Sequence, residues 1–107
     1  MTTSNSNGSQ TAVISTEHTL ATITTSGSFV LGIDANAMAL GDKLTLKVKH
    51  KVRSTGTTRL AYEANYAHVQ GTPVILSIPV ASTNEIVFTL TQTAGTGRAF
   101  PWEIWEL

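Results

Sequence analysis

The sequence predicts an all-β protein, and three observations support this fold class. Residues 43–53 alternate apolar and polar side chains without interruption, which is the period of a β-strand. Only 13% of the side chains are charged, while Ser and Thr are abundant. Turn residues separate short apolar runs at regular spacing, as in an antiparallel sandwich or barrel. With 107 residues, the chain is long enough for one domain with its own core.

Along the chain, a polar segment comes first. Residues 1–10 have almost no apolar surface, so we expect a flexible N-terminal arm followed by a single domain over residues 11–107. The one helical candidate is residues 35–40, which Gly41 would close after a turn or two. The domain is expected to contain about eight strands. We place them at residues 11–16, 19–25, 28–34, 43–53, 58–68, 73–80, 85–92 and 102–107.

Two of these strands carry bulky apolar side chains at alternate positions, which we assign to the core. Pro73 and Pro79 cannot donate ladder hydrogen bonds, so residues 73–80 are expected at a sheet edge. The assigned core residues are Phe29, Leu31, Ile33, Ile86, Phe88 and Leu90.

The strands at 43–53 and 58–68 are expected to pair. Both have their apolar side chains at even positions, and directly opposed residues must share a face of the sheet. A turn at Gly56 then favours a register that places His50 opposite Tyr62 and Lys49 opposite Glu63.

The polar face of residues 43–53 is the most distinctive surface feature of the sequence. Five of the seven basic side chains stand there, although the net charge of the chain is zero. We interpret this basic row as a binding surface for an acidic protein. Lysines that protect a sheet edge from aggregation are the alternative. Nucleic-acid binding is less favoured, because no aromatic residues interleave and the pI is about 6.8. The basic row consists of Lys43, Lys47, Lys49, Lys51 and Arg53.

The C-terminal strand offers a second candidate surface. If Trp102 and Ile104 point into the core, Trp105 and Leu107 must point away from it. We expect Trp105 and Leu107 to contact another subunit, with core packing and carbohydrate binding as alternatives.

Nothing in the sequence favours catalysis, a cofactor or a metal site. The chain has no cysteine, and the spacing of His18, His50 and His68 is not that of a metal site. The glycine-rich residues 92–98 lack the phosphate-binding pattern, and we interpret them as a hairpin turn with an exposed Arg98. No apolar run is long enough for a signal peptide or a membrane span. We therefore expect a soluble, non-secreted protein that is not an enzyme and has no membrane partner.

Three stretches carry a resemblance to a known group: Asn36-Ala-Met-Ala-Leu-Gly-Asp-Lys-Leu-Thr-Leu46, Lys51-Val-Arg-Ser-Thr-Gly-Thr-Thr-Arg59, and residues 90–102. Over residues 11–107 the chain resembles small virion proteins encoded beside the head genes of tailed bacteriophages. The resemblance implies a sandwich or jelly-roll-like domain, synthesised in the host cytoplasm, that decorates the capsid as a trimer or another homo-oligomer. The partner would be the major capsid protein, contacted through the arm and the basic row. A neck or tail protein and a glycan-binding module remain alternatives.

Overall fold

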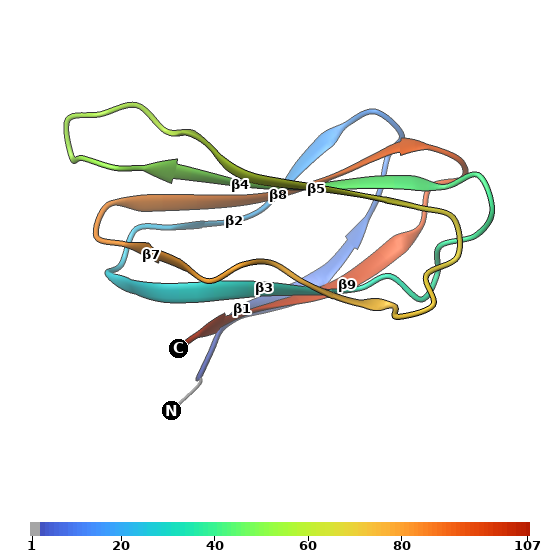
Figure 1. Cartoon of the computed structure of the whole chain (residues 1–107), viewed down its shortest axis with the longest axis horizontal. Helices are drawn as coiled ribbons and strands as arrows, with labels where there is room; N and C mark the ends of the chain where they lie inside the picture. Colours follow the sequence, from blue (N-terminus) through green and yellow to red (C-terminus); the bar gives the residue numbers. More distant parts are fainter. Residues whose placement is uncertain (1–2) are drawn as a thin grey trace.

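The computed structural model describes residues 3–107, which form nine β-strands in two antiparallel sheets packed face to face (Figure 1). The predicted all-β sandwich is therefore confirmed. Residues 35–40 form turns instead of a helix, and within 3–107 no helix could span a membrane. The strands are β1 (Thr3–Thr11), β2 (Glu17–Ile23), β3 (Gly27–Asp34), β4 (Lys43–Lys51), β5 (Arg59–Ala67), β6 (Val74–Leu76), β7 (Val80–Ser82), β8 (Glu85–Ala94) and β9 (Ala99–Glu106).

The order of the strands is that of a jelly roll. Sheet A runs β1-β9-β3-β6, with β7 also paired to β3, and sheet B runs β2-β8-β4-β5. The pairs β1·β9, β2·β8, β3·β6/β7 and β4·β5 are those of one long antiparallel hairpin whose tip is the β4–β5 connection. Because successive pairs alternate between the two sheets, this hairpin is rolled up on itself. The additional pairs β3·β9 and β4·β8 complete each sheet.

The core lies between the sheets and contains the side chains that the sequence assigned to it from residues 28–34 and 85–92. All six assigned residues are buried, together with the even-numbered apolar side chains of β4 and with Phe100 and Ile104 of β9. The alternation within each strand therefore separates one buried face from one outer face, as expected for a sandwich.

The flexible arm is a wrong prediction for the residues that the structure describes. Thr3–Thr11 is strand β1, which pairs with β9 from Thr3 opposite Glu106 to Thr11 opposite Ala99. Most of its side chains are exposed, so β1 is held chiefly by main-chain hydrogen bonds, which a polar sequence makes as well as an apolar one. The strand expected at residues 11–16 does not form, because β1 ends at Thr11 and the following residues make a turn.

The strand expected at residues 73–80 lies at a sheet edge, as predicted, but it is divided into β6 and β7. Ser77 lies between the two pieces and exchanges two hydrogen bonds with Leu31 of β3. The Leu31 N–H donates to Ser77 Oγ (2.9 Å), and the Ser77 N–H donates to the Leu31 carbonyl (2.8 Å). A side chain thus replaces one main-chain contact, which explains why one expected strand becomes two.

Strands β4 and β5 share their apolar face up to Val48, but the predicted register is wrong. Val48 lies opposite Tyr62, and the next pair, Lys49 with Leu60, skips one residue of β5. The strands are therefore already shifted by two residues from the predicted register at Val48, and the β-bulge adds one more residue, which turns Leu60 outward and places Arg59 opposite His50. An extra residue of this kind leaves no mark in the alternation of either strand.

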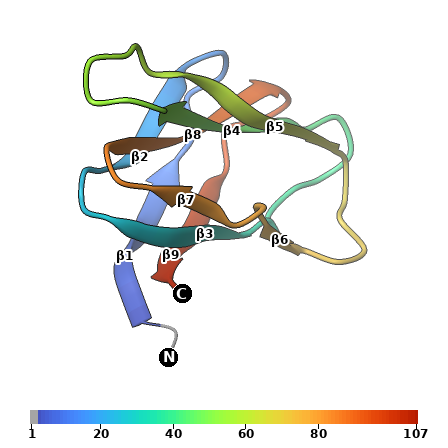
Figure 2. The same cartoon turned by 60° about the vertical axis from the view of Figure 1, so that its left-hand side comes forward.

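The two ends of the sandwich differ in which connections they carry (Figures 1 and 2). The β1–β2, β3–β4, β5–β6 and β8–β9 connections meet at one end, which we call the loop end. Main-chain hydrogen bonds join them there, including Ala12 N to Arg98 O and His68 N to Asp42 O, each 2.8 Å. The opposite end, which we call the hairpin end, carries the β4–β5 connection and the two termini of the described chain.

Candidate functional site

The basic row lies on the outer face of sheet B, along a central strand. β4 is flanked by β8 and β5, and the edges of sheet B are β2 and β5. The interpretation of these lysines as protection of a sheet edge is therefore wrong. Arg53 does not belong to the strand, because β4 ends at Lys51. It lies in the β4–β5 connection, where Val52 is 79% exposed instead of buried.

The centre of the basic row is paired within the chain. Lys47 Nζ lies 3.8 Å from Glu63, its cross-strand neighbour, and Lys49 Nζ lies 3.1 Å from Glu17 of β2. The predicted pair of Lys49 with Glu63 does not form, because the register is shifted. Glu17 also accepts a hydrogen bond from Thr89 Oγ1 (2.7 Å). This hydrogen bond and the neighbouring Lys49 outweigh burial and lower the pKa of Glu17.

The ends of the basic row form no ion pair within residues 3–107. Lys43 is exposed, and Lys51 stands opposite Glu85 in β8 with no contact short enough for an ion pair. Four lysines on this face are balanced by Glu17, Glu63 and Glu85. The outer face of sheet B is thus a mixed, slightly basic surface, and it is less basic than the sequence alone suggested.

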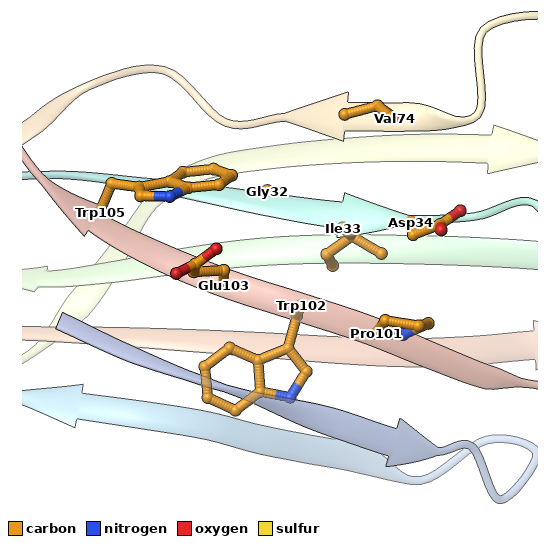
Figure 3. A pocket seen from close by; sticks show the side chains of 8 residues that line it. All are labelled: Gly32, Ile33, Asp34, Val74, Pro101, Trp102, Glu103 and Trp105. Atoms are coloured by element: carbon orange, nitrogen blue, oxygen red, sulfur yellow. The ribbon is translucent and has the colours of Figure 1, made fainter. Parts of the chain in front are cut away.

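The outer face of sheet A carries the second candidate surface. Trp105 lies opposite Val30 and extends its indole across Gly32 (Figure 3). A Cβ on Gly32 would overlap the indole, so the glycine allows the ring to lie close to the sheet. Beside the ring is a shallow hollow of about 240 Å³, bordered by Val74 and by two carboxylates. Its outward-facing lining residues are Gly32, Asp34, Val74, Pro101, Glu103 and Trp105.

The side chains of β9 divide between the faces as the sequence predicted. Ile104 is buried, and Trp102 packs against the core beside Gly8 of β1. Trp105 is half-buried on the outer face, and Leu107 is exposed just after the strand, with its N–H donating to the Ser28 carbonyl (2.9 Å). Core packing is thereby excluded for Leu107, and Trp105 and Leu107 are both accessible to a partner.

A polar cluster at the loop end was missed by the sequence analysis. Asp42 is only 1% exposed, and its buried carboxylate accepts three hydrogen bonds. Ala39 N (2.9 Å) and Arg98 Nε (2.8 Å) donate to Oδ2, and Thr96 N (3.1 Å) donates to Oδ1. Burial alone would raise the pKa of Asp42, but these hydrogen bonds and the Arg98 charge lower it overall.

The β8–β9 connection is built around this carboxylate. Gly95 adopts a φ of +92°, and a Cβ there would overlap Asp42 Oδ1. Gln92 is fully buried, donates to the carbonyls of Ala94 and Thr96, and accepts the Arg98 N–H (3.0 Å). The prediction of a hairpin with an exposed Arg98 is wrong, because β8 and β9 lie in different sheets and Arg98 is half-buried against Asp42.

No sequence signal joins Asp42 to Arg98, because they are far apart in the chain and meet only after the sheets have rolled together. Both oxygens of Asp42 already accept hydrogen bonds from the protein, so this carboxylate is suited to fixing loops and not to transferring protons.

The histidines are also held separately. Within residues 3–107, no group of three or more His, Asp or Glu side chains is placed to hold a metal ion. One ring nitrogen of each histidine bonds a different main-chain group: Val13 N for His18, Ala81 O for His50 and Gly41 N for His68.

Comparison with known proteins identifies no relative of this chain. The chain matches no family model, and no curated protein or solved structure matches it. The chemistry of the two outer sheet faces is therefore the basis for inferring function.

Proposed function

We propose that this protein is a bacteriophage virion structural protein, specifically a capsid decoration (cement) protein that binds the outer surface of the head and stabilises the shell. The resemblance of residues 36–46, 51–59 and 90–102 to small virion proteins supports this proposal. So does the jelly-roll architecture, which recurs in viral capsid domains. Because one fold can serve many functions, the proposal depends mainly on the surface chemistry.

The observation that carries the proposal is the position of the basic row. Lysines on a central strand have no edge to protect, so their outward charges are available for a partner. The two ion pairs within the face do not prevent binding, since exposed pairs are worth only about 0–1 kcal/mol and can be exchanged for carboxylates of a partner. On a symmetric shell, many such modest contacts add up.

The test is attachment to particles that lack the protein. Replacing Lys43, Lys47 and Lys51 by Gln removes three charges and spares the Lys49–Glu17 pair. We expect the triple variant to stay folded and to bind particles about tenfold less tightly, or weaker still, in co-sedimentation. Replacing the same lysines by Arg keeps the charge and is the matched control. Equal binding by the Gln variant would contradict a role for the basic row.

The amount of protein in purified virions distinguishes locations in the particle. A decoration protein is expected in a fixed ratio to the major capsid protein, measurable by gel densitometry. A few copies per particle would instead indicate a neck or tail protein.

A glycan-binding module is the second candidate, and the hollow beside Trp105 favours it. Indole rings stack on sugar faces, and carboxylates accept hydrogen bonds from hydroxyl groups. Binding of soluble oligosaccharides by the wild-type protein, lost in Trp105→Ala, would replace the decoration proposal with this one.

A further inference from the structure

The outer face of sheet A has acidic side chains without cationic neighbours. None of the five strands of sheet A contains a Lys or Arg in its described residues. Asp34 and Glu103 border the hollow beside Trp105, and neither makes an ion pair within residues 3–107. Close to them, Val74 and Leu76 are 63% and 56% exposed. This face, which we call the acceptor face, combines an apolar centre with two carboxylates and an indole.

The β4–β5 connection has the opposite character. It projects beyond the neighbouring connections at the hairpin end (Figure 1). Arg53 and Arg59 stand at its two sides, and neither has an ion-pair partner in the described chain. Val52 is 79% exposed and Leu60 53% exposed beside them. These residues, 52–60, form a projecting hairpin with two cations and two apolar side chains.

We propose that the projecting hairpin of one copy docks on the acceptor face of a second copy. Two unpaired guanidinium groups match two unpaired carboxylates, and the exposed apolar side chains next to each charge pair would be buried together. An indole beside carboxylates is well suited to a guanidinium, which stacks on aromatic rings and forms bidentate pairs with carboxylates. Arg and Trp are also the residue types that dominate protein interfaces.

The proposed contact is heterologous, since the two partners use different surfaces. Each copy has one hairpin and one acceptor face, so copies join head to tail and either close into a ring or extend as a filament. The contact does not cover Lys43, Lys47 and Lys49 on the outer face of sheet B. It adds a subunit contact to the proposed decoration function but does not depend on it, because self-association is measured with purified protein and no virions.

Two charge-changing variants test the contact. Arg53→Glu with Arg59→Glu reverses the hairpin from two positive to two negative charges. Asp34→Asn with Glu103→Lys makes the acceptor face positive. Asp34 Oδ1 accepts a hydrogen bond from the Asn36 N–H (3.0 Å), and the amide oxygen of an Asn at position 34 can accept the same bond. Each variant then opposes like charges across the contact. We expect the dissociation constant for self-association, measured by sedimentation velocity, to rise about tenfold or more in each.

Mixing the two variants provides the decisive measurement. The negatively charged hairpin of the first variant can dock on the positively charged acceptor face of the second. The unaltered positive hairpin of the second variant and the unaltered negative acceptor face of the first also have opposite charges. We therefore expect the mixture to assemble although neither variant does so alone. Assembly of the wild-type protein should weaken as salt concentration rises. Replacing only Lys43 and Lys47 by Gln changes charge away from the hairpin, and this double variant should self-associate like the wild type.

Several results would overturn the proposed contact. A wild-type protein that stays monomeric at every accessible concentration would exclude it. Self-association that neither variant weakens would place the interface elsewhere, and a mixture that stays dissociated would show that the two sets of charges do not face each other. If an oligosaccharide binds at Trp105 without competing with self-association, the acceptor face has another occupant. Loss of particle attachment with intact self-association would affect only the decoration function.

Discussion

The β8–β9 and β4–β5 connections are similar in sequence but are held very differently. Residues 95–98 and 52–58 are both largely polar, contain Gly and Thr, and lie next to or include an arginine. The first connection crosses between sheets and is hydrogen-bonded to the buried Asp42 and Gln92. In the second, residues 53–57 form one main-chain hydrogen bond within the described part of the chain, from Gly56 N to Arg53 O (2.9 Å). How firmly a loop is held thus depends on buried polar partners supplied by other parts of the chain.

The largest expected difference between the connections comes from Asp42. Asp42→Ala leaves three donors without their acceptor and Arg98 without its counter-ion. We expect the free energy of unfolding to fall by about 3 kcal/mol, because buried groups that lose their partner carry the full desolvation penalty. Urea denaturation measures this change. Arg53→Ala in the β4–β5 connection is the control and should stay within about 0.5 kcal/mol of wild type.

A matched pair of glycines tests the same difference in the backbone. Gly95→Ala must place a Cβ at a φ of +92° and against Asp42, so we expect a loss of about 2 kcal/mol in the free energy of unfolding. In Gly56→Ala the new Cβ meets atoms of Arg53, of which the carbonyl oxygen is nearest at 3.2 Å, and the φ of residue 56 is not in the left-handed region. We expect it to cost less than about 1 kcal/mol. Equal losses would mean that the two connections are equally constrained.

Acid should weaken the loop end selectively. The pKa of Asp42 is lower in the folded than in the unfolded protein, where the ordinary value is 3.8, so folding favours its charged form. The resulting stabilisation is complete above the ordinary value and is lost as pH falls through the folded pKa. We expect the difference in unfolding free energy between wild type and Asp42→Asn to shrink over that acidic range. A difference independent of pH would show that the charge of Asp42 does not matter.

The smallest expected effect concerns the base of the β4–β5 connection. Thr58 Oγ1 donates a hydrogen bond to Glu85, and both side chains are half-buried. Removing the hydroxyl in Thr58→Val should cost about 0.5–1 kcal/mol in thermal or urea unfolding. A loss as large as that of Gly95→Ala would mean that this connection is anchored as strongly as the β8–β9 connection.

The sequence predicted the faces of the strands well because alternation is a local property. Leu44, Leu46 and Val48 are buried, and the lysines between them face outward, whichever strands lie alongside. The place of β4 in the middle of sheet B depends on which other strands pair with it, and periodicity contains no such information. For the same reason the bulge opposite Lys49 was not predicted.

For the candidate site residues, too, the sequence predicts which face a side chain lies on but not which distant residues it contacts. The outward direction of Trp105 follows from the inward direction of Ile104, and the structure confirms it. The indole lies across Gly32, a residue of another strand, and Asp42 meets Arg98 across the rolled sheets. Contacts of this kind need the tertiary structure. The strand β1 was missed for a different reason: its polar side chains suggested disorder, whereas its main chain forms the contact with β9.

The pairing of β1 with β9 also has a consequence for the order of folding. Strand β1 can pair only after β9, which lies at the other end of the described residues, has come alongside it. The β4·β5 pair closes the shortest loop and is expected to form early, and the β1·β9 pair to form late. Until β1 pairs, its polar side chains expose little apolar surface, so the unpaired strand has a low tendency to aggregate. In a pulse-labelling experiment during refolding, the amides of β1 should gain protection after those of β4. Early protection of β1 would exclude this order.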